Sequence, residues 1–478
     1  MKEEDEKEEN HLVFYEYDSK GNPKIIHRKL MIFLGENGFT VMNIGGTSRL
    51  VRIVDNVISD ADEEDLSRFL SKYLESIGKI DILDLFVQGV SAYLSKKKYA
   101  FLPKINWISD KDPKDAACFY FQNTVVRVTK DKLELIPYSA LNHKIWKNRI
   151  LDRDFNDVPR GNGQFEDFCY KLSKENPERF KAFKTAIGYL LHRHNDESIV
   201  KAIILLDENA TIGGQTNGGT GKSLIFKALS HFVETVLIDG KNMKQDSRFN
   251  NQRISHTSDI INFDDINHKF SLELIYSMTT SGIVIEKKGK DECVLKSEDS
   301  PKIMITSNQP VKGPGGSSDI RRRCEFEVPN YFSDTWTPKD EYGKLFFSQW
   351  DDIEWNMFDC FMIECVQLFL KEGLLEAKPL KLKVNKLIQL TSPEFHNFIS
   401  KDAITIGKWI DKNEFLQQFT DAYPKLEDVK SNSLTRWMKK YCEENDLEYT
   451  DKKTGEKFEF KLIKRSETDN EKGDEDNL

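Results

Sequence analysis

One glycine-rich run holds residue types that together bind a polyphosphate. It consists of Gly218, Gly219, Thr220, Gly221, Lys222 and Ser223. Glycines let the backbone turn its N–H groups toward phosphate oxygens, and the amino end of a following helix favours negative charge. Lys222 would then reach the β- and γ-phosphates of ATP, and the Ser223 hydroxyl would bind Mg²⁺. The alternative is a plain glycine-rich turn, because Thr216 replaces the usual first glycine and the preceding loop is long.

Two later apolar runs end in side chains that could complete such a site. Residues 260–263 are followed by Asp264 and Asp265, one carboxylate to hold Mg²⁺ through water and a second to orient an attacking water. Residues 302–307 are followed by Asn308, whose amide could hydrogen-bond the γ-phosphate or that water. Taken alone, two acids after a strand are common and Asn308 could be a turn residue. Downstream of a phosphate loop, we expect all three to be catalytic.

Three consecutive arginines, Arg321, Arg322 and Arg323, precede the strand-like run CEFEV. A guanidinium at this place could reach the nucleotide of a neighbouring subunit and stabilise charge that develops during hydrolysis. We expect Arg322 to have this catalytic role. The alternative is a cluster of surface salt bridges.

An α/β fold is the arrangement that would position these side chains. The apolar run IVKAIILL at 199–206 is short enough to be a buried parallel strand. From there to about residue 310, strand-like and helical segments alternate, which is typical of a parallel sheet covered by helices. Residues 165–195 have helical spacing, and residues 352–374 are predicted to form an amphipathic helix.

The glycine-rich run, the two acids after the first later strand, Asn308 and the arginine cluster occur in this order. Together they resemble the motifs of superfamily 3 helicases of the AAA+ class. The resemblance extends to the helicase part of phage- and poxvirus-type primase-helicases. It covers roughly residues 165–400 and is carried by the segments AIGYLLHRH, GGTGKS, SPKIMITSN, RRRCEFEVPNYF and DDIEWNMFDCFMIECVQLFL. It implies an AAA+ P-loop ATPase core in a ring, most simply a hexamer. Its partners would be single-stranded and forked duplex DNA, together with a primase or another replication protein.

A basic hairpin is predicted between the two acids, Asp264 and Asp265, and Asn308. The segment GIVIEKKGKDECVL alternates like two strands and places Lys287, Lys288 and Lys290 at its turn. In the resembled family, hairpins at this place project into the channel and contact DNA phosphates. Lysines on a hairpin suit such sequence-independent contacts. The alternative is a solvated hairpin whose lysines protect a sheet edge.

The C-terminal segment is predicted to be a winged helix. One helix is expected in NEFLQQFTDAYP, which ends at a proline. A second helix is expected in SNSLTRWMKKYCEEND, with Ser431 or Ser433 as N-cap. Two strands around a Thr454–Gly455 turn follow. The basic residues that would face DNA phosphates are Arg436, Lys439, Lys440, Lys452, Lys453 and Lys457. A winged helix that docks a protein, or a structural cap, is the alternative.

The N-terminal part is predicted to be a small α+β domain. Residues 13–17, 30–44 and 49–54 are strand-like, and a helix is expected to start near Ser59–Asp60. The predicted organisation is an acidic tail (1–10), this domain (11–150), a helical linker or collar (151–196), the ATPase core (197–330), a helical region (331–400), the winged helix (401–465) and a second acidic tail (466–478).

Composition excludes several classes of protein. The chain has 478 residues and a net charge of −9. Residues 1–10 supply −4 of this charge and residues 466–478 supply −5, so the charge between the tails is near zero. The net charge therefore does not exclude a nucleic-acid partner. No apolar run is long enough to span a membrane. Seven scattered cysteines and an acidic N-terminus favour a reducing, cytoplasmic location in a bacterial or infected cell. The sequence therefore predicts an ATP-driven replicative DNA helicase of a phage, plasmid or mobile element. An AAA+ ATPase that remodels proteins is the second interpretation.

Overall fold

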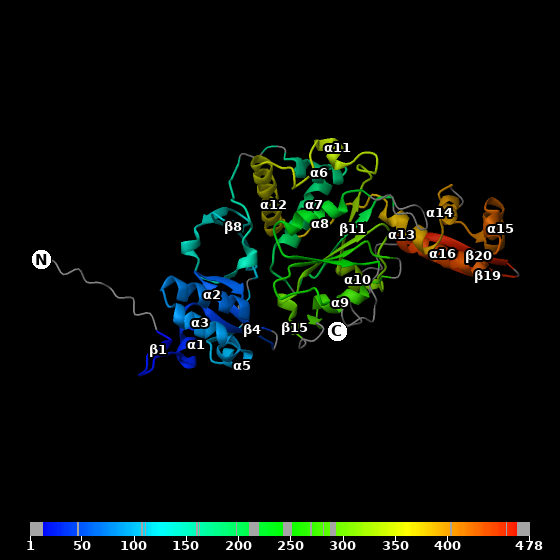
Figure 1. Ribbon diagram of the computed structural model, residues 1–478. Helices are drawn as coiled ribbons and strands as arrows, with labels where there is room; N and C mark the ends of the chain where they lie inside the picture. The colour runs from blue at the N-terminus through cyan, green and yellow to red at the C-terminus, as the bar shows by residue number, and fades with distance from the viewer. Residues whose placement is uncertain are drawn as a thin grey trace.

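The computed structural model describes residues 13–44, 47–106, 109, 111–158, 161, 163–196, 198–209, 219–241, 251–267, 270–280, 282–286, 293–401, 404–455 and 457–465. The fold is mixed α/β (Figure 1), in agreement with the predicted class. Along the chain, an N-terminal sheet with helices is followed by a central sheet, and a small helical module with a long hairpin lies at the other end. Among the described residues, no helix is both long and apolar enough to cross a membrane.

The central sheet has five strands in the order β12-β13-β16-β11-β17. They are β11 (Ala202–Asp207), β12 (Thr235–Asp239), β13 (Ile260–Asp264), β16 (Lys302–Ser307) and β17 (Arg323–Val328). All pairs are parallel, and β11 is buried along its whole length, as the apolar run predicted. All five strands therefore end at one edge of the sheet.

Helices cover both faces of this sheet because successive strand residues point to opposite sides. Ile203 and Leu205 belong to one hydrophobic core, and Ile204 and Leu206 belong to another. The first core also contains residues of α6 (Gln164–Leu172), α7 (Pro177–Leu191), α8 (Lys222–Ser230) and α12 (Asp352–Glu372). The second contains residues of α9 (Glu273–Thr280) and Leu382 of α13 (Leu382–Leu390).

The helical segment expected over 165–195 is two helices. Helix α6 ends at Leu172, and α7 begins at Pro177 with Asn176 as its N-cap. Lys174 and Glu175 between them have positive φ angles of 60° and 52°, which are incompatible with a continuous helix. Apolar spacing continues across the break, so the pattern alone did not reveal it.

The N-terminal sheet has the order β10-β5-β4-β3-β6. Its strands are β3 (Phe39–Ile44), β4 (Thr47–Val54), β5 (Val57–Asp60), β6 (Lys104–Asn106) and β10 (Ile145–Trp146). The nearby helices are α1 (His27–Glu36), α2 (Glu63–Ser76), α3 (Ile80–Gln88), α4 (Val90–Tyr93) and α5 (Lys96–Tyr99). Strands β1 (Tyr15–Tyr17) and β2 (Pro23–Ile25) form a separate pair.

Two local predictions for this part are wrong. Residues 30–36 belong to α1, and only the end of the expected 30–44 strand is β3, because Leu30, Phe33 and Leu34 bury a helical face. Helix α2 begins at Glu63 after the N-cap Asp62, whose side chain accepts a hydrogen bond from the backbone N–H of Asp65. Ser59 and Asp60 instead end strand β5.

A third sheet connects these parts. Strands β7 (Ala116–Tyr120), β8 (Val125–Thr129) and β9 (Leu133–Ile136) are antiparallel, and their side chains join the core that contains α7 and α12. Arg149 pairs with Asp259, directly before β13, and both side chains are buried. This ion pair joins the N-terminal part to the amino edge of the central sheet.

The remaining elements lie mainly in the C-terminal half. They are β14 (Ile283–Ile285), β15 (Cys293–Leu295), α10 (Gly316–Arg321), α11 (Pro338–Tyr342), α14 (Pro393–Ile399), β18 (Ile410–Asp411), α15 (Lys412–Ala422), α16 (Ser431–Glu444), β19 (Leu447–Thr454) and β20 (Lys457–Lys464). Strands β14 and β15 pair antiparallel, as expected of a hairpin. Helix α16 has Lys430 as its N-cap and no side-chain cap, so the prediction of Ser431 or Ser433 there is wrong.

Candidate functional site

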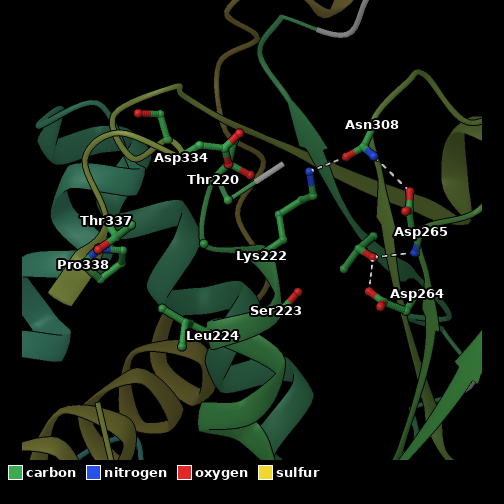
Figure 2. Close-up of a pocket in the computed structure, with 14 residues that line it drawn as sticks. Thr220, Lys222, Ser223, Leu224, Asp264, Asp265, Asn308, Asp334, Thr337 and Pro338 are labelled. Atoms are coloured by element: carbon green, nitrogen blue, oxygen red, sulfur yellow. Dashed lines mark hydrogen bonds between the residues drawn. The ribbon is translucent and has the colours of Figure 1, made fainter. Parts of the chain in front are cut away.

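A cavity of about 540 Å³ lies at the carboxyl edge of the central sheet. Its walls come from the start of α8, the ends of β13 and β16, and the segment before α11 (Figure 2). In parallel α/β sheets, ligands bind in crevices outside the carboxyl ends of the strands. The lining residues include Gly219, Thr220, Gly221, Lys222, Ser223, Asp264, Asp265 and Asn308, all predicted from the sequence. Gly218 lies outside the described residues.

Gly221 is required by the backbone and by packing. Its φ angle is +101°, and it directly precedes α8, which begins at Lys222. A Cβ at this position would lie 2.7 Å from Cζ of Phe168, a buried ring of α6. Any side chain would therefore push the loop away from α6, and the amino end of α8 would lose its position at the cavity.

Lys222 extends into the cavity from the first turn of α8 (Figure 2). Its Nζ lies 2.5 Å from Oδ1 of Asp207 and donates a hydrogen bond to Oδ1 of Asn308 at 2.9 Å. Burial lowers the pKa of the Lys222 ammonium, and Asp207 opposes that shift. A buried cation that faces a polar cavity is suited to an anionic ligand.

The two acids after β13 have different surroundings. Oδ1 of Asp264 accepts a hydrogen bond of 2.6 Å from the Thr306 hydroxyl on β16. Asp265 has a φ angle of +49°, which turns it out of the strand, and its Oδ1 accepts a hydrogen bond of 2.9 Å from the Asn308 amide. Asn308 therefore bridges Lys222 and Asp265. Lys222, Asn308 and Asp265 form one hydrogen-bonded chain across the ends of two strands, and Asp264 lies beside it, bonded to Thr306.

Two charged partners of this chain were not identified from the sequence. Asp207, at the end of β11, pairs with Lys222 and accepts a hydrogen bond of 2.8 Å from the Thr220 hydroxyl. Lys241, which follows β12, forms an ion pair with Asp265. Both lie at or just after the end of a strand of the central sheet. This position was the signal by which the sequence could have assigned them to the site.

A further wall of the cavity was also missed. Ser333, Asp334, Thr337 and Pro338 line the side facing the glycine-rich run. A Cβ on Gly219 would lie 3.3 Å from Oδ1 of Asp334, so the two segments are in close approach. Thr337 is the N-cap of the short helix α11 and forms a capping box with Asp340. The Thr337–Pro338 pair is a typical helix start, but nothing local ties it to a site.

The donor set fits Mg²⁺. Ser223, Asp264 and Asp265 offer hydroxyl and carboxylate oxygens, the ligands this cation prefers, on one side of the cavity. Across the described residues, no group of three or more His, Cys, Asp or Glu could hold a metal. Mg²⁺ bound here would keep several waters and share phosphate oxygens, which is its usual mode in nucleotide sites.

The three arginines have distinct environments, none of them at the cavity. They surround the start of β17, at the amino edge of the sheet, opposite the site. Arg323 is paired with Asp319 at 2.7 Å and with Glu325 at 3.1 Å, so its charge is neutralised within the chain. Arg322 is partly exposed, donates a hydrogen bond to the Ser318 hydroxyl and lies 4.8 Å from the Tyr276 ring centroid. Arg322 therefore does not line this cavity in its own chain.

The predicted DNA contacts divide into three groups, of which one, Lys452, Lys453 and Lys457, lies on the β19–β20 hairpin. Lys287, Lys288 and Lys290 lie outside the described residues, although the hairpin strands that flank them are present. Arg436, Lys439 and Lys440 lie on α16, away from the buried stripe of Leu434, Met438 and Cys442. Lys439 lies 5.4 Å from the Tyr449 ring centroid, and Lys440 pairs with Glu443 at 2.6 Å.

His192 and His194, which follow α7, could suggest a metal site, but His192 is engaged otherwise. The His192 Nε2 lies 3.0 Å from the carbonyl oxygen of Pro113 and 3.1 Å from that of Ala116. Burial lowers the pKa of His192 to about 4, so the ring is neutral at physiological pH. It is part of the packing between β7 and α7.

Comparisons with known proteins give distant likenesses. Residues 215–323 match a family of unknown function, DUF5906; this segment contains Lys222, Asp264, Asp265 and Asn308. No curated protein matches the sequence. Two apo structures of the NrS-1 C-terminal region, one of them the A form, align with a TM-score of 0.42 and 13% identity. These alignments cover 91% and 90% of this chain and 98% and 97% of those chains.

Proposed function

We propose that this protein is an ATP-driven nucleic-acid motor of superfamily 3 type, a hexameric replicative DNA helicase of a phage, plasmid or mobile element. The observation that carries the proposal is the hydrogen-bonded chain Lys222–Asn308–Asp265 across the carboxyl edge of a parallel sheet. A buried cation and a carboxylate joined by one amide support this proposal, because the cation would stabilise phosphate charge and the carboxylate would activate water in the same cavity. This is the requirement for hydrolysis of a nucleoside triphosphate.

Each side chain has a separate role in this proposal. Lys222 and the N–H groups at the start of α8 bind the phosphates. Ser223 and Asp264 hold Mg²⁺, which when bound neutralises charge on phosphate oxygens. Asp265 orients and deprotonates the attacking water, and Asn308 fixes Asp265 relative to Lys222.

A ring is proposed because the cavity lining, within the described residues, contains no arginine of the same chain. Arg322 lies at the opposite edge of the sheet and is partly exposed, and in this proposal it faces the site of a neighbouring subunit. Its guanidinium would stabilise the charge of the transition state across that interface. An isolated subunit should therefore hydrolyse ATP poorly.

The motor is tested by ATP hydrolysis with and without single-stranded DNA and by strand displacement on 3′- and 5′-tailed duplexes. We expect hydrolysis to be stimulated several-fold, the stimulation to fall steeply with salt, and one tail polarity to be unwound. Lys222→Ala is the control for both assays. Hydrolysis that single-stranded DNA leaves unchanged, with no unwinding of either substrate, would contradict the proposal.

An AAA+ ATPase that remodels protein partners is the second candidate. The observation that favours it is apolar surface on the C-terminal module, where Ile406 is 48% exposed. In that case the module would dock a protein and not DNA. Hydrolysis stimulated by a protein partner, and insensitive to DNA, would support this candidate.

A further inference from the structure

The hairpin of β19 and β20 projects beyond the core of the C-terminal module (Figure 1). Each strand has 8 residues. At about 3.4 Å per residue, each spans ~27 Å. Leu447, Phe460 and Leu462 are buried in the core of the module, whereas Asp451–Gly455, Lys457 and Phe458 are exposed. The turn half of the hairpin therefore extends past the core that anchors the other half.

Two exposed aromatic rings lie on or beside this hairpin, Phe458 in its projecting half and Trp409 next to β20, and each is accompanied by lysines. Trp409, directly before β18, is 37% exposed, with the Nζ atoms of Lys452 and Lys461 at 4.0 Å and 4.8 Å from its ring centroid. Phe458 is 45% exposed, with Nζ of Lys453 at 5.2 Å. Each ring therefore combines an apolar face with a nearby positive charge.

The rings lie on opposite faces of the hairpin. Phe458 shares its face with Phe460 because residues two apart on a strand point the same way, and its cross-strand partner is Lys453. Lys461 and Lys452 lie on the other face, next to Trp409. A ligand that follows the hairpin would meet aromatic and basic groups on either side.

Charge identifies the kind of ligand. The acids of the projecting half are already paired: Asp451 with Lys412 at 2.5 Å, and Glu459 with Lys452 at 3.3 Å. Lys457 and Lys461 add positive charge to the face next to Trp409, and Lys453 adds it to the face of Phe458. Surfaces that combine lysines with exposed rings bind single-stranded nucleic acid, because bases stack on the rings while phosphates contact the cations. In a duplex, the bases are already stacked on one another and the rings would have little to contact.

We propose that the β19–β20 hairpin together with Trp409 is a single-strand binding surface, on which Trp409 and Phe458 stack against bases and Lys452, Lys453 and Lys461 contact phosphates. The proposal rests on the proposed function only in taking nucleic acid as the partner. It adds a stacking contact, and a preference for single strands, to the phosphate contacts that the sequence predicts for the basic residues of α16 and of the β19–β20 hairpin.

The test is the affinity of the full-length protein for labelled oligo-dT and for a duplex of equal length, measured by fluorescence anisotropy. Trp409→Ala and Phe458→Ala should each weaken oligo-dT binding by roughly five- to a hundredfold. Trp409→Phe should restore most of the affinity, because a phenyl ring also stacks. Replacing Lys452 and Lys461 by alanine should make the dependence of log K on log [salt] shallower by about 0.7 for each lysine that binds a phosphate.

Phe101→Ala is the matched control, because this ring is 77% exposed on the N-terminal part. It should leave oligo-dT binding unchanged, and thermal melting of every variant should show that the fold is kept. If the wild-type protein binds oligo-dT and both alanine variants bind it equally well, the surface assignment is overturned and the motor proposal stands. If the wild-type protein binds neither oligonucleotide, both proposals fail.

Discussion

Nζ of Lys222 lies 2.5 Å from Oδ1 of Asp207, so the ammonium assigned to phosphate binding is already paired with a carboxylate. The side chains are only 11% and 7% exposed. An unpaired charge in such a place is costly, which explains why Asp207 accompanies the lysine. In the proposed function, a nucleotide phosphate would share Lys222 with Asp207 or replace that contact.

Lys222→Ala should reduce ATP hydrolysis to background, because it removes the buried cation placed to neutralise the phosphates. Hydrolysis is measured by phosphate release and binding by fluorescent nucleotide titration. The fold should be retained, with a lowered melting temperature because Asp207 loses its partner. Wild-type turnover in this variant would contradict the assignment of the phosphate loop.

Asp207→Asn should change how nucleotide binding depends on pH. Burial lowers the pKa of Lys222, and Asp207 opposes that shift, so removing the carboxylate should lower the pKa further. Only the protonated lysine attracts phosphate. Affinity should therefore be lost at a lower pH than in the wild type as pH rises, which is measured by nucleotide titrations from neutral to alkaline pH. Asp299→Asn, at the other edge of the sheet, is the control and should keep the wild-type curve.

Asp265→Asn should separate binding from hydrolysis. The variant keeps a partner for Asn308 and loses the carboxylate that would take the proton of the attacking water. We expect kcat to fall by about 10²- to 10⁴-fold with nucleotide affinity nearly unchanged. Equal kcat in wild type and Asp265→Asn would exclude Asp265 as the base.

Asp264→Asn should instead raise the Mg²⁺ concentration needed for half-maximal hydrolysis.

Arg323→Ala should lower stability, whereas Arg322→Ala should abolish hydrolysis without lowering stability. Arg323 is paired with Asp319 and Glu325, and Glu325 is also paired with Lys386, so loss of Arg323 leaves Asp319 without its cation and should lower the free energy of unfolding by ~3 kcal/mol or more. Arg322→Ala should leave the melting temperature and nucleotide binding near wild type and abolish hydrolysis. Mixing it with Lys222→Ala should restore some activity at mixed interfaces. Mixed rings without restored activity would argue against an arginine acting between subunits.

His192 should contribute to loss of stability in acid. Its pKa is lowered to about 4 by burial, so below its ordinary pKa of 6.5 the unfolded chain binds a proton that the folded chain does not. The free energy of unfolding should fall by up to about 3 kcal/mol as pH decreases across that interval. In urea unfolding, His192→Gln should show a weaker pH dependence than wild type, because an amide still donates and does not titrate.

The sequence by itself determined where the side chains of the candidate site lie along the chain. The glycine-rich run, the two acids and Asn308 each adjoin the carboxyl end of an apolar strand or the start of a helix, and such ends are recognisable from local pattern. Because the strands are parallel, those ends meet at one edge, and the predicted side chains come together. The β14–β15 pairing and the Thr454–Gly455 turn also followed from local alternation and turn residues.

Only the tertiary structure decided which charges face one another. Asp207 and Lys241 stand at or after strand ends, but strand order decides that they face Lys222 and Asp265. The 333–338 wall reaches the site because segments far apart in the chain approach each other. Neither the strand order nor this approach has a local signal. The same holds for the three arginines, since only the packing around the start of β17 distinguishes the paired Arg323 from Arg322. Helix and strand patterns reflect interactions over a few residues, whereas the pairing of buried charges depends on which elements become neighbours.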